Sequence, residues 1–218
     1  MQVGIINNNY NNKYKATNFK KILRNNIPEK AIKDNNYLLL VSGPSGVGKD
    51  TIMNKILHKF NKVVTHTTRP KREGEVEGKS YFYTTVEQFK EGIKNNEFIE
   101  YVKGFSGNYY GTKKETVKNA LDGKKPALLI VDIDGADAIK KNLKNNSNLN
   151  VVSIFIKPPS FDILKARLLK RGTETPDAMQ ERLNKAMYEM QHAQNFDAEI
   201  QNNHFTESIK DLEELLHI

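Results

Sequence analysis

The sequence predicts an α/β fold in which a parallel β-sheet is flanked by helices. Three apolar runs, at residues 37–41, 127–131 and 151–156, do not alternate with polar residues, and Ser153 is the only serine within them. Such runs are typical of parallel strands that are buried on both faces. Segments with helical periodicity lie between these runs and after them, and strands that alternate with helices predict a doubly wound parallel sheet.

The first 36 residues differ in composition from the remainder of the chain. They are rich in Asn and Lys and contain few acidic residues. We interpret residues 1–36 as a low-complexity N-terminal extension and residues 37–218 as one folded domain. Two roles of the extension stay open at this point, a disordered tail and an organelle-targeting segment.

The predicted domain starts with a strand at 37–41, which is followed by a glycine-rich turn and a helix at 51–60. This order is typical of the first unit of a nucleotide-binding βαβ fold. From 63 to 112 the sequence changes to short polar strands, several glycines and many charged or aromatic residues. This change predicts an insert that is held against the core.

The second half of the predicted domain alternates helices and strands. We expect a helix at 114–121, followed by the apolar strands at 127–131 and 151–156. Three further elements are then expected: helices across 160–195 with an interruption around 172–176, a short strand at 198–200, and an amphipathic helix at 208–216.

Composition and charge exclude several classes of protein. The chain has no cysteine, so it can form neither a disulfide nor a thiolate metal site. No stretch approaches the roughly 18 to 20 apolar residues that span a bilayer, and the N-terminus lacks the continuous apolar segment of a secretory signal peptide. We therefore expect a cytoplasmic protein without a membrane partner. The net charge of +8 fits either a lysine-rich solvated surface or attraction of anionic ligands such as nucleotides.

The sharpest local motif is the glycine-rich segment GPSGVGK at 43–49. Glycines let successive backbone N–H groups face one anion at the positive end of the following helix. The lysine of such a loop reaches the β- and γ-phosphates of a nucleotide. The motif therefore predicts an ATP-binding phosphate loop, formed by Ser45, Gly46, Val47, Gly48 and Lys49.

The residue after the lysine departs from the usual pattern of such loops. Ser or Thr normally stands there as a ligand of Mg²⁺, but this chain has Asp50, with Thr51 next. Thr51 could supply the hydroxyl. Asp50 could bind the metal itself, favour the helix N-terminus electrostatically, or repel the phosphates and slow the reaction. Asp132 ends a predicted buried strand, where a Mg²⁺-bound water needs a carboxylate partner, although acids also often simply end strands.

A basic and aromatic cluster follows in the predicted insert. Arg69 and Arg72 lie three residues apart, and Tyr81 and Tyr110 supply phenol groups. Such side chains could clamp a second phosphate by bidentate hydrogen bonds. Taken alone, the cluster is more typical of a solvated surface.

Three more arginines, Arg167, Arg171 and Arg182, lie in the predicted helical region near the C-terminus. Arginines on a mobile lid stabilise the charge of a phosphoryl-transfer transition state only after the lid closes. Composition alone would again favour a plain surface.

Taken together, the ordered motifs resemble those of the guanylate kinase family, from about residue 37 to residue 216. The resemblance implies a P-loop NTPase-like parallel sheet with a GMP-binding insert at 65–113 and a helical lid at 158–187. The core would then consist of residues 37–64, 114–157 and 188–218. The motifs that carry the resemblance are SGPSGVGK (42–49), HTTRPKR (66–72), GE (74–75), GK (78–79), EFIE (97–100), SGNYYGT (106–112) and RGTET (171–175).

The resemblance also implies an activity, the Mg²⁺-dependent transfer of a phosphoryl group from ATP to GMP, with dGMP as a further acceptor. It implies catalytic roles for Lys49, Arg72, Arg171 and Arg182. The binding roles that it implies are these: Arg69, Arg72, Tyr81 and Tyr110 for the GMP phosphate; Thr65, Glu100, Thr112 and Asp134 for guanine; Arg167 and Asn202 for ATP, with Asn202 near the adenine; Thr51 and Asp132 for Mg²⁺, with Asp50 as an alternative.

A carboxylate at Glu100 suits guanine because it can accept hydrogen bonds from both N1–H and the exocyclic amine, which adenine does not present together. The chain departs from the family pattern at Thr65 and Thr112, where serine is common. It departs again after Asp134, where Gly135-Ala136-Asp137 replaces an apolar residue, Gln and Gly.

Three other functions are weighed against a guanylate kinase. A catalytically weak guanylate-kinase-like module that binds phosphoproteins typically loses the intact ATP loop, whereas this chain keeps Lys49 and its glycines. Glu100 argues against a kinase for an adenine acceptor. The positive charge alone could attract nucleic acid, but the sequence has no recognised nucleic-acid module. We therefore expect GMP and ATP as partners, no nucleic acid, and a monomer, with a homodimer as the alternative.

Overall fold

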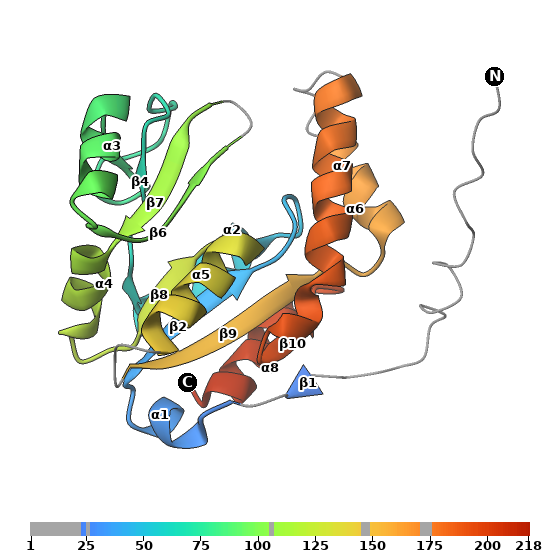
Figure 1. Cartoon of the computed structure of the whole chain (residues 1–218). Coiled ribbons are helices and arrows are strands. Elements are labelled where there is room, and N and C mark those ends of the chain that lie inside the picture. Colours follow the sequence, from blue (N-terminus) through green and yellow to red (C-terminus); the bar gives the residue numbers. More distant parts are fainter. Residues whose placement is uncertain (1–22, 25–26, 105–106, 145–148, 171–175) are drawn as a thin grey trace.

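A six-stranded β-sheet forms the centre of the protein, and a smaller four-stranded sheet lies beside it (Figure 1). The computed structural model describes residues 23–24, 27–104, 107–144, 149–170 and 176–218. The strand order of the main sheet is β1-β10-β9-β2-β8-β3, and its described strands are parallel except for β1. These strands are β1 Leu23–Arg24, β2 Tyr37–Ser42, β3 Asn61–Lys62, β8 Ala127–Ile130, β9 Asn150–Lys157 and β10 Ala198–Gln201.

The strand β2 is buried along its whole length because it pairs with β8 on one side and with β9 on the other. Side chains of a strand point alternately to the two faces of the sheet. Accordingly, Leu39 and Val41 belong to one core cluster, and Leu38 and Leu40 belong to a second one. This arrangement explains why the strand is a continuous apolar run, and it places the end of β2 in the middle of the sheet.

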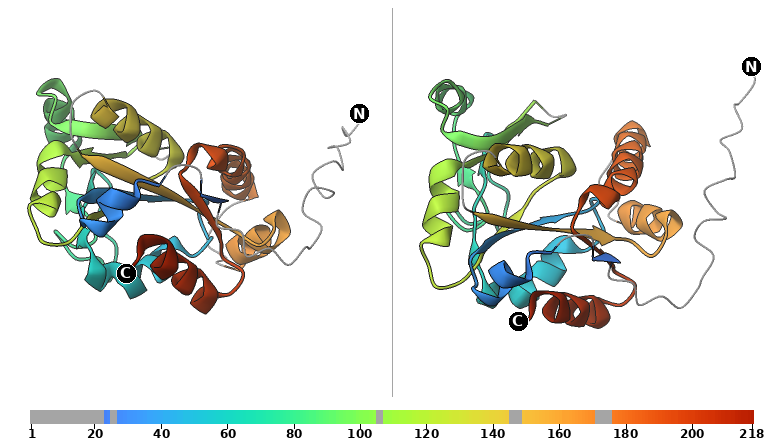
Figure 2. Two further views of the ribbon diagram at one scale, coloured as in Figure 1. Left: turned by 90° about the horizontal axis from the view of Figure 1, so that it is seen from below. Right: turned by 60° about the horizontal axis from the view of Figure 1, so that its bottom comes forward.

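Helices cover both faces of the main sheet, as Figure 2 shows for α5 and α8 on opposite sides. The first core cluster includes residues of α2, α6, α7 and α8, and the second includes residues of α4 and α5. The helices are α1 Glu29–Lys33, α2 Lys49–Ile56, α3 Val86–Lys94, α4 Lys114–Leu121, α5 Ile133–Lys144, α6 Phe161–Leu169, α7 Pro176–Gln191 and α8 Phe205–Leu216, with the 3₁₀ turns η2 Leu57–Lys59 and η3 Ala193–Asn195.

The folded part of the chain begins before the predicted boundary at residue 37. Residues 29–33 form the short helix α1, and its side chains Ala31 and Ile32 are buried in the first core cluster. The expectation of an extension through residue 36 is therefore wrong for this helix. The Asn and Lys around these two apolar residues lower the mean hydropathy of the segment and hide its contribution to the core.

The insert has its own sheet, with the strand order β5-β4-β7-β6. Strands β4 and β5 are parallel, whereas β7 is antiparallel to both β4 and β6. Figure 1 shows the insert in green on one side of the molecule, and α6 and α7 on the other side. The insert strands are β4 His66–Thr67, β5 Phe82–Tyr83, β6 Phe98–Lys103 and β7 Tyr109–Lys113.

Besides α1, two helices were not predicted from the sequence. The helix α3 of the insert begins at a capping box, in which Thr85 and Gln88 each satisfy a backbone N–H of the other. The helix α5 begins directly after β8, at residues that had been expected only to end a strand. In both cases polar residues directly before the helix and short spacing of its apolar residues obscure the helical pattern. No helix in the described part of the chain is long and apolar enough to cross a membrane.

Candidate active site

The phosphate loop connects the end of β2 to the first turn of α2. Gly43 and Gly48 have φ angles of 146° and 100°, which side-chain-bearing residues rarely adopt. A Cβ atom at Gly43 would lie 2.3 Å from the carbonyl oxygen of Ile156, so a larger residue cannot fit there. The backbone therefore wraps tightly enough to direct the N–H groups of the first turn of α2 toward an anion.

The side chain of Lys49 lies along this loop. Its ammonium group donates to the carbonyl oxygen of Gly43 and, at 3.1 Å, to that of Pro44. The ammonium group of Lys49 therefore lies against the backbone of the phosphate loop. This is the position from which a lysine can reach the terminal phosphates of a nucleotide.

Distant side chains brace the phosphate loop at the carbonyl oxygen of Val47. The amide nitrogen of Asn202 donates to this oxygen at 2.7 Å, and the guanidinium of Arg167 donates to it at 3.4 Å. Asn202 is buried, and its own amide oxygen accepts a hydrogen bond of 3.1 Å from Ser208. The structure therefore brings both predicted ATP-side residues to the loop. It gives Asn202 a supporting role that the resemblance did not predict, and its predicted contact with adenine stays a prediction.

Asp50 and Thr51 lie in the first turn of α2, and both are exposed. Burial lowers the pKa of Lys62, and the negative charge of Asp50 opposes this effect. Burial and then Tyr110 raise the pKa of Tyr81, and Asp50 adds to the increase. The ammonium of Lys62 also donates to the backbone oxygen of Lys79 at 2.7 Å. Asp50 therefore contributes a charge between the core and the insert. Its three open roles at the nucleotide stay predictions.

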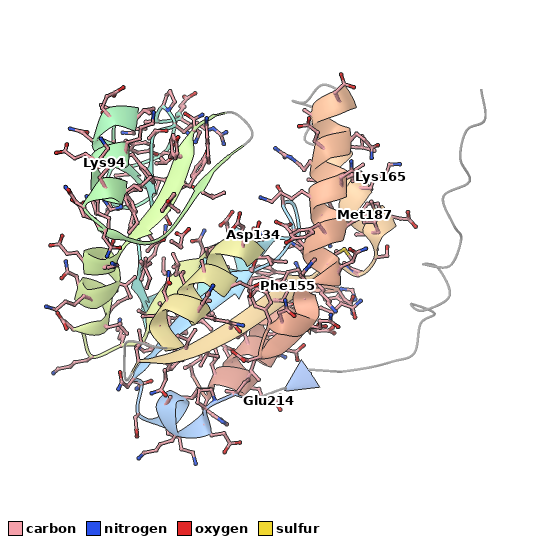
Figure 3. The ribbon with its side chains drawn as sticks, viewed as in Figure 1. Lys94, Asp134, Phe155, Lys165, Met187 and Glu214 are labelled. Atoms are coloured by element: carbon pink, nitrogen blue, oxygen red, sulfur yellow. The ribbon has the colours of Figure 1, made fainter. Side chains whose placement is uncertain are left out.

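The predicted carboxylates Asp132 and Asp134 lie at the start of α5, where Figure 3 labels Asp134. Side chains of α7 contact both. Asp132 accepts a hydrogen bond of 2.9 Å from the backbone N–H of Gly135, so it caps the helix. Its second oxygen lies 3.3 Å from the ammonium of Lys185. Asp134 accepts a hydrogen bond of 3.0 Å from the hydroxyl of Tyr188. Both carboxylates therefore have partners in the protein itself, and their roles at Mg²⁺ and guanine stay predictions.

The basic cluster of the insert is organised by one carboxylate, that of Glu75. Its oxygens contact the guanidinium of Arg69 at 2.6 Å, the backbone N–H of Arg72 at 2.8 Å and the hydroxyl of Tyr83 at 2.7 Å. The hydrogen bond from Arg69, followed by those from Arg72 and Tyr83, lowers the pKa of Glu75 to about 2. Glu75 is therefore an anion at any physiological pH, and it fixes the turn that carries both arginines.

Aromatic rings complete this cluster. The guanidinium of Arg69, which is 9% exposed, lies 5.4 Å from the ring centre of Tyr81, a distance at which a cation and a ring attract each other. The rings of Tyr81 and Tyr110 meet edge to face at 6.2 Å. The side chain of Arg72 is exposed. Thus one arginine and two phenols from separate parts of the sequence lie together, and Glu75 fixes the backbone of Arg72 in the same turn, an arrangement that suits a phosphate group.

Glu100 of β6 is buried, with 7% of its surface exposed. It accepts a hydrogen bond of 2.6 Å from the hydroxyl of Thr112 on β7. Burial raises the pKa of Glu100 to about 7, and the negative charge of Asp132 adds to the increase. For Thr65 the structure shows a backbone contact, in which its carbonyl oxygen accepts a hydrogen bond from the backbone N–H of Phe82. The structure therefore joins Glu100 and Thr112 in a site that holds a carboxyl group away from water, and their contact with guanine stays a prediction.

A second buried carboxyl group, Glu189 of α7, was not predicted. It is 6% exposed, and burial raises its pKa to about 7 against the opposing charges of Lys185 and Lys49. Arg182 is half-buried on the same helix, whereas Arg171 lies outside the described residues, so its predicted role stays a prediction. The spacing of Lys185, Tyr188 and Glu189 places them on one side of a helix. Nothing in the sequence indicates which part of the fold they face.

Comparison with known proteins agrees with this geometry. The guanylate kinase family model matches residues 35–218. A guanylate kinase of Clostridium tetani is 39% identical over 181 residues, which cover 82% of this chain and 84% of the relative. The chain belongs to the guanylate kinase family.

Two further guanylate kinases extend the comparison. That of Rickettsia felis is 39% identical over 188 residues, which cover 85% of this chain and 95% of the relative. The crystal structure of guanylate kinase from Anaplasma phagocytophilum has a TM-score of 0.65 and 32% identity, and the match covers 84% of this chain and 85% of that one. The predicted family, the α/β fold class and the prediction of a nucleoside monophosphate kinase are confirmed.

Proposed function

We propose that this protein is a guanylate kinase that transfers the γ-phosphoryl group of ATP to GMP, giving ADP and GDP, and that dGMP is a slower acceptor. The observation that carries the proposal is Glu100, a buried carboxyl group on the insert of a protein that also has an intact phosphate loop. A buried carboxylate can pair with the N1–H and amino groups of guanine. With adenine it would lose these partners, at a cost of about 1–3 kcal/mol for a buried polar group without one.

ATP is expected to lie on the phosphate loop. Backbone N–H groups at the start of α2 would bind the phosphates, and Lys49 would move from the carbonyl oxygens of Gly43 and Pro44 to the β- and γ-phosphates. Asn202 and Arg167 support this site through Val47. Asn202 is also proposed to face the adenine side.

The residues present fit Mg²⁺, which prefers oxygen ligands and is usually held by one or two carboxylates together with substrate phosphates. Thr51 offers a hydroxyl, Asp132 offers a carboxylate at the end of β8, and Asp50 is the alternative. When bound, Mg²⁺ would neutralise charge on the β- and γ-phosphates. The partner of Asp132 in the structure, Lys185, holds a positive charge at the same place.

GMP is expected under the insert. Arg69, Arg72, Tyr81 and Tyr110 would bind its phosphate, with Glu75 holding the arginines in place. The guanine-facing residues are proposed to be Thr65, Glu100, Thr112 and Asp134. No side-chain nucleophile is needed, because the GMP phosphate is itself an anion.

The transfer would then depend on positioning and on charge stabilisation. Closure of the insert at 65–113 and of the lid at 158–187 would bring Arg167, Arg171 and Arg182 to the transferring group and exclude water, which would otherwise hydrolyse ATP. An oxygen of the GMP phosphate attacks the γ-phosphorus in line, and ADP leaves on the opposite side.

The test is ADP formation from ATP and Mg²⁺ with GMP, AMP, CMP or UMP as the acceptor. Wild type and Asp50→Ser are compared, and Lys49→Met measures the background of contaminating kinases. Turnover confined to GMP, with dGMP slower, is the expected result. The Asp50→Ser variant shows whether Asp50 slows the enzyme or serves the metal.

No turnover with any acceptor, in wild type and in Asp50→Ser alike, would contradict the proposal. The catalytically weak module that binds phosphoproteins would then be the better account. A cytoplasmic location, a monomeric state and the absence of a nucleic-acid partner stay predictions.

A further inference from the structure

The helix α7 places two polar side chains over the first turn of α5. The ammonium of Lys185 lies 3.3 Å from a carboxylate oxygen of Asp132, and the hydroxyl of Tyr188 lies 3.0 Å from Asp134. Because residues three apart on a helix share a side, a single orientation of α7 serves both contacts. The two carboxylates are thus held by a helix that the sequence alone did not connect to them.

Tyr188 is fixed on the side away from Asp134 as well. Its ring packs against the imidazole of His192, with 4.1 Å between the ring centres. The ring nitrogen Nδ1 of His192 lies 2.8 Å from the backbone oxygen of Tyr188, which ties the two residues together over one helical turn. Although 42% of Tyr188 is exposed, its phenol group therefore has a defined direction.

The contact has a fixed polarity. The hydrogen bond to Asp134 and the negative charge of that carboxylate raise the pKa of Tyr188, and Asp137 and Asp132 add to the increase. The phenol therefore keeps its proton and can only be the donor to the carboxylate. Among the described residues, only the Oδ1 atom of Asp134 receives such a donor, so the Oδ2 atom keeps its capacity to accept.

An exposed Asp side chain at the start of a helix samples several rotamers. Fixing it when a ligand binds costs free energy, and a hydrogen bond within the free protein removes part of that cost. Asp134 is exposed, and its carboxylate is one of the acceptors proposed for guanine. A donor that occupies one oxygen and leaves the other available would prepare Asp134 for that role.

We propose that Tyr188 is a positioning residue for GMP, whose hydroxyl holds one carboxylate oxygen of Asp134 so that the other faces the N–H groups of guanine. This inference rests on the proposed role of Asp134. It predicts an effect on the acceptor alone, because neither group belongs to the phosphate loop or to its bracing contacts.

The experiment measures kcat, KM for GMP and KM for ATP in Tyr188→Phe, in Asp134→Ala and in the double variant. Tyr101→Phe is the matched control, since it removes the same hydroxyl from another exposed tyrosine, for which the described residues provide no hydrogen bond. Thermal unfolding of each variant shows that the fold is kept.

We expect Tyr188→Phe to raise KM for GMP about threefold to tenfold, the effect of losing one ordinary hydrogen bond. Changes in kcat and in KM for ATP should stay within about twofold, and Tyr101→Phe should match wild type. The double variant should bind GMP no worse than Asp134→Ala, because side chains that act as a unit are not additive.

The possible failures are distinguishable. If Asp134→Ala leaves KM for GMP unchanged, the role proposed for Asp134 is wrong and the inference falls with it. If Asp134→Ala raises KM for GMP but Tyr188→Phe does not, or if the two effects add, only the inference is overturned. A lower KM for GMP in Tyr188→Phe would mean that the hydroxyl competes with guanine for Asp134, which also overturns it.

Discussion

The phosphate loop and the insert are both proposed to bind phosphate, but they are built from different groups. The loop uses backbone N–H groups and one lysine, all within residues 43–51, and its shape depends on glycines that admit no side chain. The insert uses guanidinium and phenol groups that come together from residues 69–110. The first site is held by steric fit, whereas the second is held by charge.

Each site depends on a bracing side chain, which is Asn202 for the loop, with a longer contact from Arg167, and Glu75 for the arginines of the insert. Asn202 supports the loop through a neutral hydrogen bond to the carbonyl oxygen of Val47. Glu75 supports the insert through an ion pair with Arg69 and a backbone contact with Arg72. We therefore expect loss of Asn202 to weaken ATP binding and loss of Glu75 to weaken GMP binding. The effect at Glu75 should be larger, because charge is the main force in the insert.

The largest effect is expected from Glu75→Gln. The amide cannot balance the charge of Arg69, and it cannot accept from Arg72 and Tyr83 at once with the same strength, so the arginines lose their fixed positions. We expect kcat/KM for GMP to fall by about 30-fold, while KM for ATP stays within about twofold.

Steady-state kinetics with each substrate varied in turn would check this prediction, with the exposed neighbour Glu73→Gln as the control. Because the pKa of Glu75 is about 2, the loss should be equal at pH 6 and pH 8. An equal rise in both KM values would contradict the assignment of Glu75 to the acceptor site alone.

A somewhat smaller effect, on the opposite substrate, is expected from Asn202→Ala. The carbonyl oxygen of Val47 would lose its 2.7 Å donor, and only the 3.4 Å contact with Arg167 would remain. We expect KM for ATP to rise about tenfold with KM for GMP unchanged, which corresponds to about 1.4 kcal/mol. Asn203→Ala, next to it but exposed, is the control, and titration of ATP binding is the measurement. If Asn202→Ala weakened GMP binding and left ATP binding unchanged, the assignment of Asn202 to the ATP site would be wrong.

The acceptor site should also respond to pH through Glu100, whose pKa of about 7 is raised by burial. Below pH 7 the carboxyl group of the free protein is protonated, and it must lose its proton to accept both N–H groups of guanine. KM for GMP should therefore fall about tenfold between pH 6 and pH 8. The GMP phosphate titrates in the same range, so the measurement is the difference between wild type and Glu100→Gln, in which the part due to Glu100 disappears.

The same carboxyl group affects stability with a defined sign. Between its usual pKa of 4.5 and about 7, Glu100 is protonated in the folded state and ionised in the unfolded state. The free energy of unfolding should therefore fall as pH rises through this window. Urea unfolding at pH 5 and pH 8 should show a smaller decrease in Glu100→Gln, and an equal decrease would mean that Glu100 keeps an ordinary pKa in the folded state.

The sequence predicted most of the main sheet because its strands are continuous apolar runs whose neighbours follow from the βαβ order. It also predicted the phosphate loop, since that site is local. It did not predict α1, α3 or α5, whose apolar faces are short or begin after polar turns. The motifs and the family resemblance named Asn202, Val47, Glu100 and Thr112, but the hydrogen bonds that pair Asn202 with Val47 and Glu100 with Thr112 come from the fold.

The contacts of α7 with α5 show most clearly what a single sequence does not predict. Lys185, Tyr188 and Glu189 look like an ordinary polar helix face, and the charges that they meet lie more than 40 residues away along the chain. Their contacts depend on how α7 is oriented against the main sheet, which is set by the burial of Leu183 and Ala186. Such long-range pairs have no signature in a single sequence.

The smallest effect is expected at a buried polar group that neither site uses. The hydroxyl of Tyr37, at the start of β2, is buried and has no hydrogen-bond partner among the described residues, while the ring meets Phe60 edge to face at 6.4 Å. Burial also raises the pKa of this phenol, so the group is held neutral in an apolar environment. Tyr37→Phe keeps the ring contact and removes the unpaired hydroxyl, so we expect the free energy of unfolding to rise by about 1 kcal/mol with both KM values unchanged. Chemical denaturation would measure the change, and a loss of stability would mean that the hydroxyl has a partner. An altered KM for either substrate would mean that Tyr37 affects substrate binding from the core. The two sites would then depend on more than Asn202 and Glu75.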